Sequence, residues 1–164
     1  MRSQPLARAA VFAAAFLTAA CQHAPRDPLP PLPPQQVETG STFTLVAPLA
    51  FVPNMGLLFQ GQRVVTAPAI VRNRPYCRLV PQSGAPSYIQ AGNLTVRSVA
   101  YDERESGSAG SMLSVTRITL APVANQPGYV LSCGWPEASA GPAFVTTEQI
   151  DDAIGGQFTM QLLR

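Results

Sequence analysis

The sequence predicts a mainly β protein: a single compact antiparallel β-sandwich or barrel-like domain over residues 37–164, with one short C-terminal helix. Two observations lead to this fold class. From Val37 onward, short segments alternate apolar with polar residues at a period of two, as half-buried strands do. Proline, glycine and other turn-forming residues separate these segments, and an amphipathic helical pattern is found near the C-terminus alone.

The predicted strands follow one another closely along the chain. The first is 42–47, and the second and third flank Gly61-Gln62, where the glycine suits a tight hairpin. The alternation skips a residue between Val96 and Val99, which predicts a bulge near Ser98. The full set of expected strands is 42–47, 57–60, 63–66, 76–80, 94–101, 112–120, 129–133 and 157–163.

The single predicted helix precedes the last strand. Thr146 or Thr147 can cap its start, and Gly155-Gly156 ends it. Ile150 and Ile154 are four residues apart and are expected to share its buried face. Together with the strands, this helix gives a domain of about 128 residues, which is large enough to bury a hydrophobic core.

Residues 1–20 have the layout of a secretory signal peptide. Arg2 and Arg8 supply positive charge, and an uncharged apolar stretch follows from Ala9 to Leu17. That stretch is shorter than the ~20 apolar residues that a transmembrane helix needs. Cleavage and secretion are therefore favoured over a membrane-spanning helix.

The stretch Leu17-Thr18-Ala19-Ala20-Cys21 resembles the lipobox of bacterial lipoproteins, with Thr18 where the consensus favours leucine. The resemblance implies that the bond between Ala20 and Cys21 is cleaved and that Cys21 carries the acyl chains. The alternative is an ordinary signal peptide that leaves Cys21 as a free thiol. Several acyl chains would hold the protein on a membrane durably, because each buried methylene contributes about 0.8 kcal/mol.

Residues 21–36 are predicted to be a tether between the lipidated cysteine and the domain. Six prolines within 22–36 favour extended polyproline II, which rises ~3.1 Å per residue and would span up to about 45 Å. In lipoproteins of enteric bacteria, an aspartate directly after the lipidated cysteine resembles a signal for retention in the inner membrane. This chain has Gln22 at that position. We therefore expect the periplasmic face of the outer membrane in preference to the inner membrane. The whole arrangement is similar to that of small proteobacterial lipoproteins.

Charge and composition exclude several classes of function. All eleven basic residues are arginine, and loss of Arg2 and Arg8 with the signal peptide leaves nine arginines against nine acidic residues. A neutral mature chain does not favour a nucleic-acid partner. The absence of lysine excludes Schiff-base chemistry, serine–lysine dyads and phosphate-binding P-loops. The sequence contains no cofactor-binding motif, so we expect no cofactor to bind.

Cys77 and Cys133 remain as a pair once Cys21 is lipidated. In an oxidising compartment such a pair is expected to form a disulfide. It would close a loop of about 57 residues and stabilise the fold by roughly 4 kcal/mol. A metal or redox pair is the alternative, although neither cysteine lies in a C-x-x-C motif and no histidine lies near them.

Catalysis and metal binding find little support. The one histidine, His23, lies in the predicted tether, so no fold positions it against a pocket. Two acidic groups could form a cation site or a glycosidase-like pair: the loop 102–111, which begins Asp102-Glu103-Arg104-Glu105, and Glu148, Asp151 and Asp152 of the helix. We interpret them instead as a solvated hairpin tip and as favourable charge at a helix start. The sequence therefore predicts no enzyme and no metal site.

Arginines are the remaining candidates for binding. Arg63, Arg72, Arg74 and Arg78 fall in a stretch without an acidic residue, and they form an anion-binding face if they converge in space. The alternative is a set of separately solvated side chains.

Two apolar features have a second interpretation. The run 49–59 fits either a partner-facing loop or the start of a buried strand. Tyr129 and Trp135, which flank Cys133, are expected to pack in the core in preference to lining a binding surface.

These features predict a membrane-anchored accessory lipoprotein without enzymatic activity. It would bind or scaffold another envelope component, either an envelope protein or an anionic envelope polymer. The alternative is a small-ligand-binding or enzyme-inhibitor module of the periplasm.

Overall fold

The computed structural model describes residues 36–51, 56–84, 86–107, 110–121, 127–137 and 143–163. The predicted signal peptide, Cys21 and all but the last residue of the predicted tether lie outside these ranges. The elements, in chain order, are β1 (Thr42–Leu45), β2 (Leu49–Ala50), β3 (Leu57–Gln60), β4 (Arg63–Val65), the 3₁₀ turn η1 (Ala67–Ala69), β5 (Tyr76–Pro81), β6 (Tyr88–Ile89), β7 (Gly92–Gly107), β8 (Gly110–Leu120), β9 (Tyr129–Pro136), α1 (Thr147–Ile154) and β10 (Phe158–Gln161).

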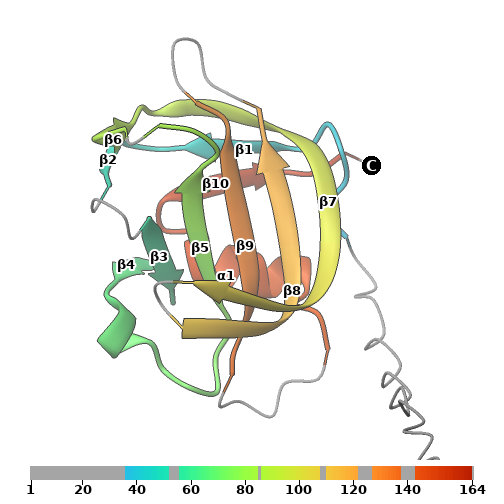
Figure 1. The fold of residues 1–164 in the computed structure, drawn as a ribbon. Coiled ribbons are helices and arrows are strands. Elements are labelled where there is room, and N and C mark those ends of the chain that lie inside the picture. The colour runs from blue at the N-terminus through green and yellow to red at the C-terminus, as the bar shows by residue number, and fades with distance from the viewer. Residues whose placement is uncertain are drawn as a thin grey trace, which may run out of the picture.

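Eight strands form one antiparallel sheet in the order β10-β1-β7-β8-β9-β5-β3-β4. The sheet curls into a half-barrel, and α1 lies against its concave side (Figure 1). A separate two-stranded ladder joins β2 to β6. The predicted mainly β, barrel-like class with one short C-terminal helix is therefore confirmed.

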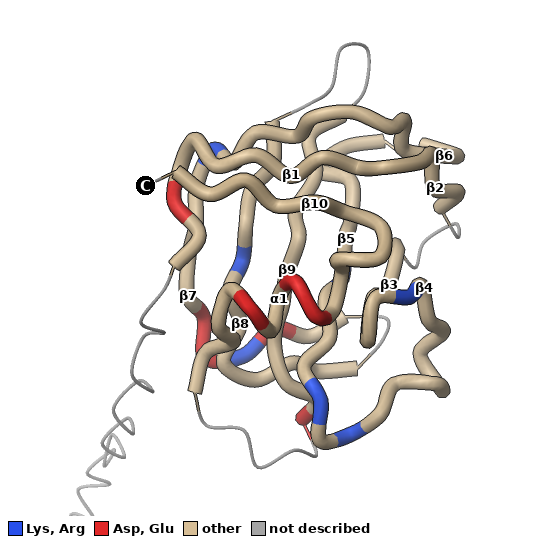
Figure 2. Tube along the Cα trace, turned by 180° about the vertical axis from the view of Figure 1, so that it is seen from behind, with Lys and Arg blue, Asp and Glu red and all other residues tan. Residues whose placement is uncertain are grey.

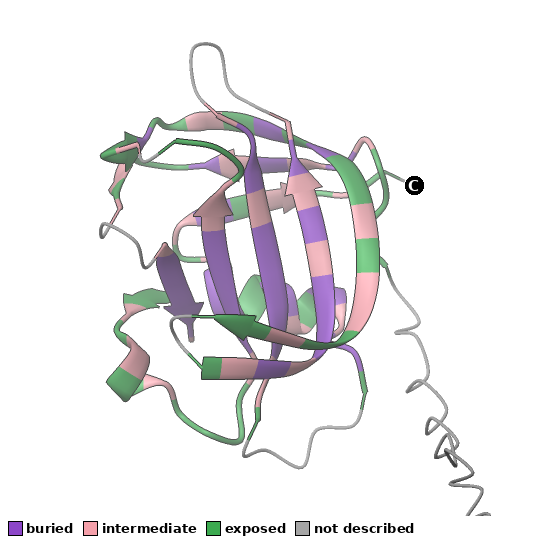
Figure 3. Ribbon diagram, in the orientation of Figure 1, coloured by how far each residue is buried: buried purple, intermediate pink, exposed green. Residues whose placement is uncertain are grey.

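The main core lies between the concave face of the sheet and α1. Ile150 and Ile154 of the helix are buried there, as the four-residue spacing predicts. The Thr146 hydroxyl accepts a hydrogen bond from the Gln149 backbone N–H, and the Gln149 side chain accepts one from the Thr146 backbone N–H. This capping box marks the start of the helix, and two glycines follow its last residue, Ile154. The helix therefore has eight residues. The central strands carry most of the buried positions (Figure 3).

The predicted disulfide is confirmed. Cys77 on β5 and Cys133 on β9 are directly opposite in the antiparallel register, and their Cα atoms are 4.1 Å apart. Both cysteines are buried in the main core. The bridge therefore joins two central strands that are 56 residues apart in sequence.

The hairpin of β7 and β8 is longer than the sequence predicts. Residues 102–107, assigned to a polar loop from sequence, continue β7 and pair with β8 up to Gly107 and Gly110. The predicted bulge near Ser98 is confirmed by a register shift between Val96 and Ser98. Two of these polar residues, Asp102 and Glu105, form ion pairs with arginines of β8 and β5, which the alternation of the sequence does not reveal.

A second irregularity bends the tip of this hairpin over the outer face of the sheet. The register of β8 with β9 shifts between Leu113 and Thr116, and Ser114 has a positive φ of 50°. The tip crosses in front of β9 and β5 (Figure 1). A second, smaller core forms beneath it from Leu58, Tyr76, Met112 and Val115.

Candidate functional site

The loop that joins β4 to β5 is held by one buried side chain. We call residues 66–75 the arginine loop. The Gln60 amide Nε2 donates to the carbonyl oxygens of Val71 and Arg74, each at 3.0 Å, and its Oε1 accepts from the Val71 N–H at 2.7 Å. Gln60 is 7% exposed, so these bonds form away from water. The Gln60 side chain therefore holds the backbone of the arginine loop at Val71 and Arg74.

Three of the four candidate arginines are on or beside this loop. Arg63, Arg72 and Arg74 are exposed, and none forms an ion pair within the described part of the chain. A Cβ at Gly61 would lie 3.9 Å from Arg74 Nη1, which places that guanidinium beside the β3–β4 turn, close to the start of β4 at Arg63. In Figure 2 the arginine on β4 and the arginines on the loop are separate along the trace, so it is the side chain of Arg74 that reaches back toward the turn.

The β3–β4 turn is tight, as predicted. Gly61 and Gln62 both have positive φ, 58° and 64°, which is the geometry of a two-residue hairpin. The Gln62 N–H donates to the carbonyl oxygens of Asp152 and Ala153 in α1. These hydrogen bonds therefore attach the turn, and with it the start of β4 at Arg63, to the helix.

Exposed apolar side chains accompany the arginines. Val64 is 45% exposed on β4, and Val71 is 57% exposed within the arginine loop. Such residues next to guanidinium groups are typical of a surface that makes mixed polar and apolar contacts. The surface formed by β4 and the arginine loop is thus the best candidate for binding.

Arg78 does not belong to this surface, which corrects the predicted set of four. It is buried on the outer face of β5, under the hairpin tip, and its guanidinium forms an ion pair with Glu105. A Cβ at Gly107 would overlap that guanidinium, so the glycine leaves the space that Arg78 fills. The sequence groups Arg78 with the other three arginines, because its carboxylate partner is 27 residues away and sequence spacing does not reveal it.

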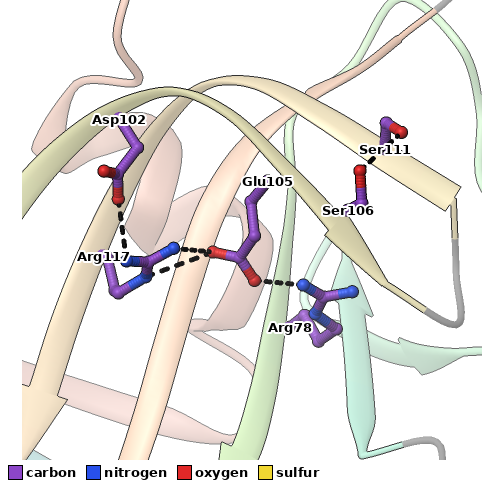
Figure 4. A network of polar contacts seen from close by, with 6 residues as sticks. All are labelled: Arg78, Asp102, Glu105, Ser106, Ser111 and Arg117. Atoms are coloured by element: carbon purple, nitrogen blue, oxygen red, sulfur yellow. Dashed lines mark hydrogen bonds and ion pairs between the residues drawn. The ribbon is translucent and has the colours of Figure 1, made fainter.

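Glu105 is the centre of a four-residue charge network (Figure 4). Its other oxygen accepts from Arg117 Nη2 at 3.2 Å and Nε at 3.3 Å, and Arg117 also pairs with Asp102 at 3.1 Å. The interpretation of the loop 102–111 as a solvated hairpin tip was therefore wrong for Glu105, whose side chain is 14% exposed. Two arginines and two carboxylates balance, so no free charge is offered to a ligand.

Opposing influences act on the pKa of Glu105. Burial by itself raises the pKa, but hydrogen bonds from Ser132 and Arg78, the charge of Arg78 and a hydrogen bond from Arg117 outweigh it, and the pKa is lowered. The carboxylate is thus charged at neutral pH. This network attaches the hairpin tip to β5, and we assign it a structural role.

Two features near this network, the Tyr76 ring and the ion pair of Arg104 with Glu137, also have a structural role. The pKa of Tyr76 is raised, first by burial and then by Glu105, while Arg78 opposes the shift. Its ring belongs to the small outer core. At the surface, Arg104 and Glu137 form an exposed ion pair at 3.0 Å.

The acidic residues of α1 lie beside an open groove. Glu148 and Asp151 line it from the helix, together with Thr147, and Met160 and Leu162 line it from β10 and the residue after it. Its volume is about 280 Å³. Among the described residues, no group of histidine, cysteine and acidic side chains could hold a metal ion.

The aromatic residues near Cys133 pack as predicted. Tyr129 is buried, and its ring stacks on Phe51 with centroids 5.9 Å apart. Trp135 packs against the main core and donates its indole N–H to the Ala143 carbonyl at 2.9 Å. In the apolar run 49–59, Leu57 to Phe59 are buried in β3, and residues 52–55 lie outside the described ranges.

Sequence reasoning missed Gln60 and the Glu105 network. The signal for Gln60 was a lone glutamine at the end of an apolar strand, where a polar side chain needs a partner.

Within the ranges that the structure covers, no helix is long and apolar enough to cross a membrane. Comparison with protein-family models, curated proteins and solved structures gives no significant match, so any function rests on the residues of this chain.

Proposed function

We propose that this chain is a membrane-anchored envelope lipoprotein of accessory, non-enzymatic type. It binds or scaffolds another cell-envelope component of anionic character, a protein or a polymer, through β4 and the arginine loop. The predicted lipobox and proline-rich tether support the anchor. The observation that carries the binding function is the set of three exposed arginines without described ion pairs, of which Arg63 is on β4 and Arg72 and Arg74 are on the loop that Gln60 holds.

The physical argument is one of preorganisation. A loop whose backbone is already ordered loses little conformational entropy on binding. Each guanidinium offers bidentate hydrogen bonds to carboxylate or phosphate, and Val64 and Val71 add apolar contact. The mature side chains sum to zero charge, so the attraction is local to this surface and does not come from the whole molecule.

Photo-crosslinking in cells tests this function. A photoreactive residue replaces Asn73, which is exposed between Arg72 and Arg74, in the full lipidated chain. We expect a discrete adduct that is lost in the double variant Arg72→Gln/Arg74→Gln. The matched control is Arg97→Gln, which removes an exposed arginine from β7 and should keep the adduct. An adduct that persists in the double variant, or none at all, contradicts the proposal.

The anchor is tested separately. Cys21→Ser should abolish incorporation of a radioactive fatty acid and release the protein from the membrane fraction, since the variant lacks the thiol that the lipobox presents. Labelling that persists in this variant would refute the lipoprotein assignment. The double variant Cys77→Ser/Cys133→Ser should keep the label, which controls for the other cysteines.

An enzyme-inhibitor module is the second candidate. The observation that favours it is the same ordered loop, because an ordered exposed loop can insert into the cleft of an enzyme with little further loss of conformational entropy. If the crosslinked component is an enzyme, adding the protein should lower its activity, and the arginine-loop double variant should restore it. An unchanged activity would leave the scaffold as the supported function.

A further inference from the structure

The outer face of the sheet carries a row of polar residues beneath the hairpin tip, which comprises residues 102–107 of β7 and 110–115 of β8. Arg78 on β5 and Arg117 on β8 are each directly opposite Ser132 on β9 in the antiparallel register. Residues opposite one another in neighbouring strands project from the same face of a sheet. Two guanidinium groups therefore flank one hydroxyl across three strands, and Arg78 and Ser132 are both buried.

A single carboxylate fills this row. Glu105 accepts hydrogen bonds from Ser132 and from both arginines. One of its oxygens faces Arg78 and the other faces Arg117 (Figure 4). Asp102 pairs with Arg117 and balances one of the two arginine charges. One positive charge is left for the ligand, which matches a planar, singly charged carboxylate held between two guanidinium groups.

The β7 part of the hairpin tip depends on this contact. The ladder of β1 with β7 covers Gly92 to Thr95, so among the described strands residues 102–107 pair with β8 alone. Of these six residues, only Asp102 and Glu105 are partly buried, and both pair with arginines of the row. Glu105 therefore fastens the tip to the sheet in the way that a ligand binds its receptor.

The surroundings of the row are shaped for this contact. A Cβ at Gly134 on β9 would lie 2.8 Å from the Leu113 carbonyl oxygen, so β9 carries no side chain where the tip crosses it. Tyr76 is buried two residues before Arg78, and within the described residues its hydroxyl has no hydrogen-bond partner. The charges of Arg78 and Glu105 both act on the pKa of Tyr76, so this hydroxyl is a further donor beside the row that Glu105 does not use.

We propose that Arg78, Ser132 and Arg117 form a carboxylate-binding site and that Glu105 is its built-in ligand, so that the hairpin tip acts as a latch over the outer face. A free carboxylate of the same size occupies the site when Glu105 is removed, and it closes the latch again. The site involves neither the arginine loop nor the lipid anchor, so the inference goes beyond the function proposed above.

Rescue by acetate tests the site. Glu105→Ala removes the group beyond Cβ, and acetate has the size and, at pH 7, the charge of that group. Hydrogen exchange is followed by mass spectrometry on the full chain in neutral detergent micelles, with sodium chloride holding the ionic strength constant. Without acetate, the amides of residues 102–107 should exchange roughly 10-fold faster than in the wild type, while those of β9 should not change. Acetate should reverse this difference with a saturable dependence on its concentration.

Matched controls separate a specific site from a general effect of the salt. The wild type, whose site is filled, and Glu103→Ala, which loses an exposed carboxylate of the same tip, should not respond to acetate. Arg78→Met/Glu105→Ala should not respond either, because it lacks one guanidinium of the site. Acetamide has the shape of acetate without its charge and should not slow exchange in Glu105→Ala. An equal response to acetate in Glu103→Ala, or a response of Glu105→Ala to acetamide, would overturn the proposal.

Ser132→Ala tests the latch if Glu105→Ala does not fold. It keeps Glu105 and both arginines but removes one hydrogen bond to the carboxylate, so exchange of residues 102–107 should become roughly five-fold faster. Unchanged exchange in this variant would refute the latch. All of these measurements use the chain without a partner, so their failure would leave the proposed function of the arginine loop intact.

Discussion

Glu105→Gln should destabilise the domain strongly, because the carboxylate neutralises two arginines at once. The Glu105 side chain is 14% exposed and that of Arg78 is 6% exposed, so the ion pair that joins them is buried. Glutamine keeps the shape of the side chain but leaves the Arg78 guanidinium uncompensated beneath the hairpin tip. Arg117 retains Asp102 and water, since it is 39% exposed.

The expected loss in the free energy of unfolding is about 3 kcal/mol, at the lower end of the range for breaking a buried ion pair. Urea unfolding followed by circular dichroism measures it. With a urea m-value of ~2 kcal/mol/M, the midpoint should fall by roughly 1.5 M. The slope itself should not change, because the hairpin tip covers only a small core.

Glu103→Gln is the matched control for this prediction. Glu103 is exposed, and within the described chain it forms no ion pair, so its loss should change stability by less than ~0.5 kcal/mol. The double variant Arg78→Met/Glu105→Leu should be more stable than Glu105→Gln, because it removes both buried charges. Equal midpoints for Glu105→Gln and Glu103→Gln would refute the structural role of the network.

The remaining predictions concern acid, the arginine loop and the disulfide. The pKa of Glu105 in the folded protein is lowered from 4.5, so its contribution to stability is present above pH 4.5 and declines as the pH falls toward the folded pKa. In acid titrations over that pH window, the wild type should therefore lose more stability than Glu105→Gln. Gln60→Leu should speed hydrogen exchange of the Val71 amide roughly 30-fold, since about 2 kcal/mol of hydrogen bonding is lost, and unchanged exchange would argue against the loop being held by Gln60. Replacing Cys77 and Cys133 by alanine should lower stability by roughly 4 kcal/mol in urea, and a loss below ~1 kcal/mol would show that the bridge constrains little.

Local patterns were enough to predict most of the elements. Alternation of apolar and polar residues indicated the strands, and a skipped residue indicated the bulge near Ser98. Thr146 and the two glycines at 155 and 156 delimited the helix. The disulfide followed from counting, because two cysteines remained once Cys21 was assigned to lipidation. Each of these signals acts over a few residues or depends on composition alone.

The arrangement of the candidate site required the tertiary structure. Arg74 and Arg78 are only four residues apart in the same stretch without acidic residues. Yet Arg78 is buried against Glu105, whereas Arg74 is exposed on the arginine loop. The extension of β7 through polar residues was also missed, because the charges that pair with Asp102 and Glu105 come from other strands. Sequence periodicity reports which residues prefer water, but it does not report which distant charge will replace that water.

The sequence by itself therefore determined the β class, the helix, the cysteine pair and the absence of lysine. Only the tertiary structure decided which arginines are free, which carboxylate pairs with Arg78, and which acidic residues face a groove. The physical reason is one of range. Hydrogen-bonding period and turn chemistry are local, whereas the pairing of charges and the curling of a sheet depend on residues that folding brings together from far along the chain.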